Sequence, residues 1–135
     1  MSGKLLLVSA AAIFDKQGRI LLAQRPEGKH MAGLWEFPGG KVEAGETPEA
    51  ALVRELQEEL QIKVEEADLD PINFASFNYP DFHLLMPLFA VSHWVGIPTA
   101  LEGQTLDWVR PANLGKYPAP PADIPLFADL AERFS

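Results

Sequence analysis

The sequence contains no cysteine, which excludes disulfide bonds, thiolate zinc sites and a cysteine nucleophile. Basic residues are also scarce, because 11 Lys and Arg stand against 19 Asp and Glu and give a formal net charge of −8. Such a chain lacks the positive surface that binding to a nucleic acid polymer requires. No apolar run reaches the roughly 18 residues of a membrane span. We therefore expect a cytoplasmic protein that binds neither a nucleic acid polymer nor a membrane.

The length and composition are those of one ordinary globular domain. The chain has 135 residues, of which 47% are hydrophobic and 22% charged, and this balance is unlike that of a disordered protein. Residues 1–19 include a short apolar stretch that resembles a signal peptide, but its alternation and the turn that follows favour a strand. We expect residues 1–135 to form a single domain and the protein to be a monomer.

The order of the predicted elements is typical of an α+β protein. Apolar runs at residues 5–14 and 19–25 flank a turn and predict a β-hairpin. Thr47 and Pro48 are a typical helix start, and the helix is predicted to end near Leu60. Further strands are predicted at residues 34–37, 72–78, 83–93 and 105–110, and a last helix at 126–134. This pattern predicts a mixed β-sheet packed between helices.

Three glutamates of the predicted helix share one face. Glu55, Glu58 and Glu59 lie together because spacings of three and four residues place helical side chains over one another. A solvated acidic face is the simpler interpretation of such a cluster. Two observations favour a metal site instead. Arg54 is the only cation on this helix, and a glycine turn at residues 38–40 precedes it.

Carboxylates at this spacing suit a hard divalent cation. Mg²⁺ takes oxygen ligands and bridges to phosphate oxygens, and Mn²⁺ is a possible substitute. Glycines let the backbone come close and add a carbonyl ligand. A bound metal would neutralise a polyphosphate and lower the pKa of a bound water. The metal would then supply the positive charge that the side chains lack.

The same stretch carries a longer pattern, namely Gly40, Glu46 and then the run RELQEE at residues 54–59. This arrangement resembles the Nudix box, the signature of hydrolases that cleave nucleoside diphosphates linked to another moiety. Gln61 departs from the pattern, because the family usually has glycine at this C-cap position. The resemblance implies the Nudix fold, an α/β/α sandwich.

The likeness extends over nearly the whole chain to the MutT branch, nucleoside triphosphate pyrophosphohydrolases that remove oxidised dGTP from the nucleotide pool. The stretches AQRPEGKHMAGLWEFPGGK, NYPDFH, LEGQTLDWV and YPAPPADIP have counterparts in the same order. The resemblance implies a Mg²⁺-dependent hydrolysis of 8-oxo-dGTP to 8-oxo-dGMP and pyrophosphate. It also implies a set of metal ligands: the carbonyl of Gly39 with Glu55, Glu58, Glu59 and Glu102. Arg54 and Glu46 would orient these ligands.

Several residues are candidates for substrate contacts, and each has a simpler alternative role. Arg25 is either a surface cation or a substrate contact, since its family counterpart lies near the substrate. Lys41, beside the glycines, either contacts phosphate or offsets the charge of Glu43. His30 is either a substrate contact or a loop histidine. Phe37 and Tyr79 would stack on a nucleobase if they line a pocket, and would otherwise belong to the core.

Two positions that would read the base depart from the MutT pattern. Phe82 stands where that pattern has arginine, and Asp123 stands where it has asparagine. Asparagine both donates and accepts, whereas an ionised aspartate only accepts, which suits the exocyclic amine of cytosine or adenine or the N1–H and N2 side of guanine. The segment YPAPPADIPLF is closer to the CTP pyrophosphohydrolase branch. The alternative role of Asp123 is to cap the last helix.

Two other functions are alternatives to the hydrolysis of 8-oxo-dGTP. Hydrolysis of CTP or a modified dCTP would result if Asp123 reads an amino group. The alternative from another class is a catalytically inactive Nudix module that only senses a nucleotide. Such modules typically lose glutamates of the box, whereas this chain retains Glu46, Glu55, Glu58 and Glu59.

Overall fold

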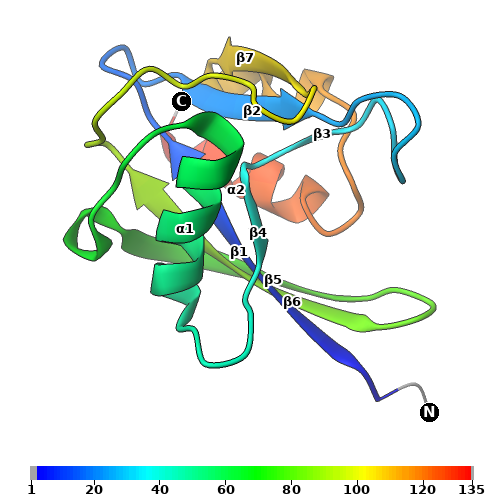
Figure 1. The fold of residues 1–135 in the computed structure, drawn as a ribbon. Helices are drawn as coiled ribbons and strands as arrows, with labels where there is room; N and C mark the ends of the chain where they lie inside the picture. The colour runs from blue at the N-terminus through cyan, green and yellow to red at the C-terminus, as the bar shows by residue number, and fades with distance from the viewer. Residues whose placement is uncertain (1–2, 135) are drawn as a thin grey trace.

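The structure is a computed structural model that describes residues 3–134 (Figure 1). In chain order its elements are β1 (Leu5–Ile13), β2 (Ile20–Gln24), β3 (Trp35–Glu36), β4 (Gly39–Lys41), α1 (Pro48–Leu60), the 3₁₀ turn Glu66–Asp68, β5 (Asp70–Asn78), β6 (His83–Val91), β7 (Thr105–Val109), the 3₁₀ turn Pro111–Lys116 and α2 (Ile124–Phe134). None of the helices in this part of the chain has the length and apolar character needed to cross a membrane.

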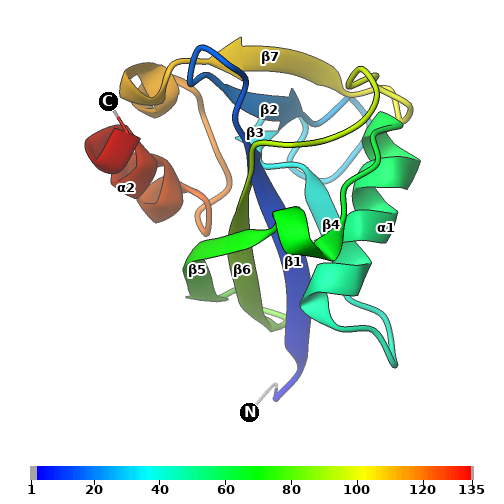
Figure 2. The ribbon, with the colours of Figure 1, turned by 90° about the vertical axis from the view of Figure 1, so that its left-hand side faces the viewer.

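The strands form two sheets. The larger sheet has the order β4-β1-β6-β5, in which β1 and β6 run parallel and the other neighbours antiparallel. The smaller sheet has the order β3-β2-β7 and is antiparallel. Helices α1 and α2 lie on opposite sides of the larger sheet (Figure 2). The predicted α+β class, with a mixed sheet between helices, is therefore confirmed.

Each face of the larger sheet has its own hydrophobic core, because alternate residues of a strand point to opposite faces. Ala10 and Ala12 of β1 belong to the cluster that includes Leu126 and Leu130 of α2. Ala11, from the same strand, belongs to the cluster that includes α1. The centre of β1 is thus buried on both faces, as its run of small and apolar residues requires.

Helix α1 has the predicted bounds, and both of its ends are capped. The Thr47 side chain accepts a hydrogen bond from the Ala50 N–H at 3.0 Å, and Pro48 occupies the first turn. Gln61 ends the helix in the left-handed conformation, with φ of 60°. Ser9 of β1 is buried and donates to the Pro48 carbonyl at 2.8 Å, which fixes the start of α1 against the sheet.

The predicted hairpin of residues 5–14 and 19–25 is wrong in its pairing, although its turn is formed. Asp15 N–H donates to the Arg19 carbonyl at 2.9 Å, and the two strands then separate after a single bridge between Phe14 and Ile20. Strand β1 already has β4 on one edge and β6 on the other, so β2 pairs with β3 and β7 instead. The sequence analysis also missed β4, a strand made of two glycines and a lysine.

Candidate active site

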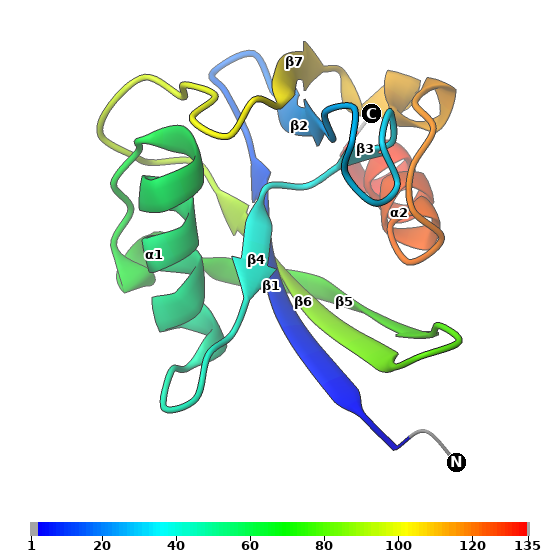
Figure 3. The ribbon, with the colours of Figure 1, turned by 45° about the vertical axis from the view of Figure 1, so that its right-hand side comes forward.

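The glycine turn brings β4 against both β1 and helix α1 (Figure 3). A Cβ at Gly39 would overlap the backbone carbonyl oxygen of Ser9, so β4 could not approach β1 at this position. A Cβ at Gly40 would instead overlap the carboxylate of Glu55, which is the end of a flexible side chain. The two glycines therefore serve different contacts, one with the backbone of the sheet and one with a carboxylate of the helix.

Arg54 lies at the centre of the carboxylates on α1. Its Nε and Nη2 atoms donate to the two oxygens of Glu46 at 2.7 and 2.9 Å, and its Nη1 donates to Glu55 at 3.1 Å and to Glu58 at 3.3 Å. Its Nη2 also donates to the Lys41 carbonyl at 3.1 Å. The hydrogen bond from Arg54 lowers the pKa of Glu46 to about 2. This geometry suits the orienting role that the family resemblance implies for Arg54 and Glu46.

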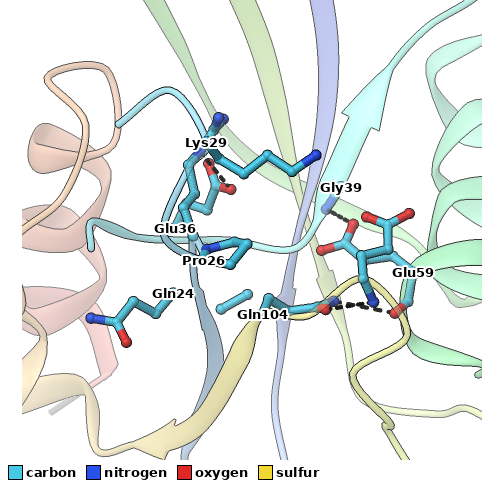
Figure 4. A pocket seen from close by; sticks show the side chains of 10 residues that line it. Gln24, Pro26, Lys29, Glu36, Gly39, Glu59 and Gln104 are labelled. Atoms are coloured by element: carbon cyan, nitrogen blue, oxygen red, sulfur yellow. Dashed lines mark hydrogen bonds and ion pairs between the residues drawn. The ribbon is translucent and has the colours of Figure 1, made fainter. Parts of the chain in front are cut away.

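Glu59 is the most deeply buried acidic residue of this cluster. Its side chain accepts from the Gly39 N–H at 3.3 Å, and its backbone carbonyl accepts from the Gln104 side chain at 3.2 Å (Figure 4). Burial raises the pKa of Glu59 to about 8, and the negative charges of Glu102, Glu36 and Glu55 act in the same direction. Burial likewise raises the pKa of Glu55.

These side chains fit a divalent cation by the chemistry of their donors. The buried carboxylate of Glu59 has one backbone donor, and besides burial itself, three neighbouring acidic side chains raise its pKa by their charge. A bound cation would relieve this repulsion, and the carboxylates supply the oxygen ligands that Mg²⁺ or Mn²⁺ prefers. Within residues 3–134, however, no three acidic or histidine side chains already converge as a metal site. Arg54 instead pairs with Glu55 and Glu58.

Beside this cluster lies a cleft of about 540 Å³, which we call the carboxylate cleft. Its lining residues are Ala23, Gln24, Arg25, Pro26, Lys29, Glu36, Gly39, Glu59, Glu102 and Gln104. The cleft thus brings together Glu59, the loop residue Glu102 and the turn residue Gly39, three of the predicted metal ligands. Glu55 and Glu58, which share a face of α1 with Glu59, lie outside this lining.

A second pocket of about 370 Å³ adjoins it, and we call it the aromatic pocket. Its lining residues are Leu6, Val8, Arg25, His30, Met31, Glu36, Tyr79, Pro80, Asp81, Phe82, Leu84, Met86, Pro120 and Asp123. Arg25 and Glu36 line both cavities, so the two cavities lie side by side at these residues. The arrangement offers one apolar compartment with flat side chains and one compartment with charged side chains.

The aromatic pocket contains five of the predicted substrate contacts, namely Arg25, His30, Tyr79, Phe82 and Asp123. The rings of Tyr79 and Phe82 lie 5.2 Å apart at 31°, from the turn between β5 and β6. Asp123 is buried at the start of α2, and its backbone carbonyl accepts from the Phe127 N–H at 2.9 Å. Within residues 3–134, no helix N–H donates a hydrogen bond to its side chain. The carboxyl group of Asp123 lines the pocket with His30.

Burial raises the pKa of Asp123 to about 7, and the negative charge of Glu36 adds to the shift. The Phe37 backbone N–H and the charge of Arg25 act in the opposite direction. Burial also raises the pKa of Glu36. Near neutral pH the Asp123 carboxyl therefore holds a proton far more often than an exposed aspartate does, and a protonated carboxyl both donates and accepts.

Arg25 lines both cavities and is held in place by its neighbours. Its Nε lies 3.0 Å from a carboxylate oxygen of Glu36, at a distance of an ion pair but without the angle of a hydrogen bond. Its Nη1 donates to the His30 carbonyl at 3.2 Å. The guanidinium thus connects strand β3 with the loop that follows β2.

Two predicted substrate contacts lie elsewhere. Phe37 is buried in the core, where its ring packs edge-on against Phe127 at 5.1 Å, and it lines neither cavity. Lys41 is exposed at the end of β4, and it too is outside both linings. Their contact with a substrate stays a prediction.

The sequence analysis missed several residues that line the cavities, most clearly Glu36, Lys29 and Gln104. Glu36 stands between Trp35 and Phe37 in a predicted strand, and an acidic residue between two aromatic residues was the available signal. Gln104 lies next to Glu102 in a loop whose conformation the sequence does not indicate.

Comparisons with known proteins were made on both sequence and structure. The sequence model of the NUDIX domain family matches residues 9–129. An 8-oxo-dGTP diphosphatase of Escherichia coli (strain K12) is 38% identical over 127 residues, which cover 94% of this chain and 97% of that protein. A CTP pyrophosphohydrolase of the same organism is 43% identical over 126 residues, covering 86% and 84%.

Solved structures similar to this chain include MutT proteins, in agreement with the sequence comparisons. A structure described for MutT of Aliivibrio salmonicida and Vibrio cholerae matches with a TM-score of 0.82 and 36% identity, covering 97% of this chain and 100% of that one. The solution structure of the Escherichia coli ORF135 protein matches with a TM-score of 0.80 and 40% identity, covering 93% and 87%.

Proposed function

This chain belongs to the NUDIX domain family and is a Nudix hydrolase, and from that premise we propose that it hydrolyses 8-oxo-dGTP to 8-oxo-dGMP and pyrophosphate. The observation that carries the proposal is that the two cavities lie side by side at Arg25 and Glu36. A nucleoside triphosphate has a flat, partly apolar base and a polyanionic chain, and the adjacent cavities match these two parts in order. The use of the reaction would be to remove oxidised nucleotides from the pool.

Nudix hydrolases generally use a divalent metal, and we assign Mg²⁺ to this chain. Glu55, Glu58, Glu59, Glu102 and the carbonyl of Gly39 would hold it. When bound, the metal would neutralise phosphate charge and lower the pKa of a water molecule. Arg54 would keep Glu46, Glu55 and Glu58 in place around it.

The side chains of the cleft would carry the remaining steps. A carboxylate of the cluster would accept the proton of the attacking water. The water attacks the β-phosphorus in line with the oxygen that leads to the α-phosphate. The bond from the β-phosphorus to that bridging oxygen breaks, so the monophosphate leaves and pyrophosphate retains the new oxygen.

The base would lie in the aromatic pocket. The faces of Tyr79 and Phe82 offer stacking surfaces, and such contacts contribute about 1–3 kcal/mol per base. Asp123 would bond to the edge of the base, and in its protonated form it could match the donor and acceptor pattern that an asparagine offers. His30 lies at the same pocket and would contact the nucleoside.

The acidic balance of the chain supports a small substrate. With a net charge of −8 the protein would repel a nucleic acid polymer, so we propose that it acts on free nucleotides. We also propose that residues 1–135 work as one domain, as a monomer in the cytoplasm.

The alternative substrate is CTP or a modified dCTP. The 43% identical CTP pyrophosphohydrolase and the acidic residue at position 123 favour it. The experiment is to measure kcat/KM with Mg²⁺ for 8-oxo-dGTP, dGTP, CTP, dCTP and 5-methyl-dCTP and to separate phosphate from pyrophosphate. A strong preference for 8-oxo-dGTP with release of pyrophosphate supports the proposal, whereas a preference for the cytosine nucleotides replaces it with the alternative.

The same assay decides between an enzyme and an inactive module. Glu59→Gln removes the buried carboxylate, and we expect kcat/KM to fall about a hundredfold or more, since even the partners of metal ligands contribute 10–100-fold. Glu132→Gln, on α2, is the matched control and should keep full activity. Equal turnover by native protein and the Glu59 variant would contradict the assignment of the carboxylate cluster.

A further inference from the structure

Lys29 lies on the loop of residues 26–33, between β2 and β3, and it lines the carboxylate cleft. Figure 4 shows its side chain extended across the cleft toward Gly39, on the side where Glu59 lies. The lysine thus lies beside Glu36, on the wall that faces the carboxylate of Glu59.

Arg25, the other basic residue of the cleft lining, and Arg54 on the neighbouring helix are already paired. Arg25 lies 3.0 Å from Glu36 and donates to the His30 carbonyl at 3.2 Å. Arg54 pairs with Glu46 at 2.7 Å and lies outside the cleft lining. Within residues 3–134, the side chain of Lys29 makes neither an ion pair nor a hydrogen bond. Its ammonium group therefore keeps three donors for a ligand.

The loop that carries Lys29 is anchored at its base. The Gly33 N–H donates to the Arg25 carbonyl, the Arg25 N–H donates to the Leu34 carbonyl, both at 3.0 Å, and the Gln24 side chain donates to the Gly33 carbonyl at 3.1 Å. Gly28 and Gly33 both have φ of 84°, a conformation that favours glycine. These contacts hold Lys29 at the mouth of the cleft instead of leaving it on a free loop.

We propose that Lys29 binds non-bridging oxygens of the substrate's polyphosphate, from the wall opposite the carboxylate of Glu59, and so favours triphosphates over monophosphates. The inference rests on the proposed function, because it assumes that the polyphosphate lies in the carboxylate cleft. Three acidic side chains and two basic ones line this cleft, so a metal and Lys29 together supply the charge that a polyphosphate requires. A compact ammonium is suited to this task because it can contact several oxygens without a fixed geometry.

The first experiment compares Lys29→Gln and Lys29→Arg with native protein on 8-oxo-dGTP and on CTP. We expect Lys29→Gln to lower kcat/KM about tenfold, by the same factor for both nucleotides, with most of the change in KM. Lys29→Arg should retain most of the activity. Lys116→Gln, an exposed lysine at the end of a 3₁₀ turn, is the control and should behave as native protein.

The second experiment measures binding directly. The affinities for inorganic tripolyphosphate and for 8-oxo-dGMP, with excess Mg²⁺, are measured by calorimetry on native protein and Lys29→Gln. The proposal is supported if Lys29→Gln binds tripolyphosphate about tenfold more weakly than native protein does, with little change in its affinity for 8-oxo-dGMP. Equal affinities for tripolyphosphate in the two proteins would overturn it, as would equal weakening of both ligands.

These outcomes separate the failure of this inference from that of the proposed function. If native protein hydrolyses neither nucleotide, the proposed function fails, while tripolyphosphate binding still decides the role of Lys29. If hydrolysis proceeds and Lys29→Gln matches native protein in both experiments, only the role of Lys29 is lost. Circular dichroism on each variant checks that the fold is kept.

Discussion

Asp123 shows how one buried carboxyl can control which base is accepted. Its carboxyl lies in the aromatic pocket with Glu36, Arg25 and Asp81, and with the side chains of His30 and Tyr79. Burial and the charge of Glu36 raise its pKa to about 7. Below this pH the carboxyl both donates and accepts, and above it the carboxylate only accepts.

The pH dependence of substrate preference follows from this protonation. Between pH 6 and pH 8 the protonated fraction of a group with a pKa of about 7 falls about tenfold. We therefore expect the ratio of kcat/KM for 8-oxo-dGTP to that for CTP to fall by at least this factor over the same range, and by about a hundredfold where CTP is read only by the ionised carboxylate. Asp123→Asn cannot titrate, so its ratio should stay flat. A flat ratio in native protein, or a fall that survives in the variant, would contradict this account.

The two glycines of β4 permit a test that separates activity from stability. Gly40→Ala places a methyl group against the Glu55 carboxylate, which can move aside at little cost in folding free energy but loses its contact with Arg54. Gly39→Ala places a methyl group against the backbone carbonyl of Ser9. This backbone cannot move aside without separating β4 from β1. We expect Gly40→Ala to keep its Tm within about 2 °C and lose about tenfold in kcat/KM.

Gly39→Ala should instead lower the free energy of unfolding by about 2 kcal/mol or more. Thermal unfolding followed by circular dichroism and the 8-oxo-dGTP assay measure the two effects. The reverse ranking, with the position 40 variant the less stable, would show that these contacts are misassigned.

The candidate site could be predicted from the sequence only where residue type and spacing decide the chemistry. The spacing of Glu55, Glu58 and Glu59 places them on one helix face whatever lies nearby. Glu36 and Lys29 reach the cleft only because strand β3 and its preceding loop fold back over it. Likewise, the residue type of Asp123 is visible in the sequence, but its raised pKa depends on burial and on Glu36 from a distant segment.

At the scale of an element, helix α1 ends at a residue that is poorly suited to its conformation. Gln61 has φ of 60°, and its N–H still donates to the Gln57 carbonyl at 3.1 Å. A residue with a Cβ loses about 1–2 kcal/mol in the left-handed region, whereas glycine does not. The C-cap residue Gln61 therefore keeps its backbone hydrogen bond to the helix, but its backbone conformation is strained.

We expect Gln61→Gly to raise the free energy of unfolding by about 1 kcal/mol. Gln57→Gly is the matched control, because Gln57 is exposed inside the same helix, where glycine should lower that free energy by about 1 kcal/mol. Urea unfolding of both variants and of native protein measures the difference. Equal destabilisation by the two substitutions would indicate that the left-handed conformation is not strained.

The elements also show why pairing is harder to predict than element type. The bounds of α1 follow from Thr47, Pro48 and the apolar spacing, all of which are local. The partner of β2 is not local, because it depends on which edges of β1 are taken by β4 and β6. Strand β4 itself has almost no strand propensity, and it pairs because glycine permits close approach to β1.

At the scale of the whole molecule, folding concentrates acidic side chains in a protein that already has a net charge of −8. Burial raises the pKa of Glu59 to about 8, and the negative charges of Glu102, Glu36 and Glu55 add to the shift. The cluster therefore opposes folding wherever its members are ionised and no cation is bound. A cation held only by the folded chain should offset this cost.

We therefore expect Mg²⁺ to raise the Tm of native protein. A concentration ten times the dissociation constant adds about 1.4 kcal/mol to the stability of the folded state, which corresponds to about 5 °C for a chain of this length. Glu59→Gln should lose most of this increase, while the control Glu132→Gln should keep it. Because salt also screens a net charge, KCl at matched ionic strength must give a smaller shift. Equal shifts with KCl and with Mg²⁺ would mean that the ion screens the whole surface and that the carboxylate cluster holds no metal.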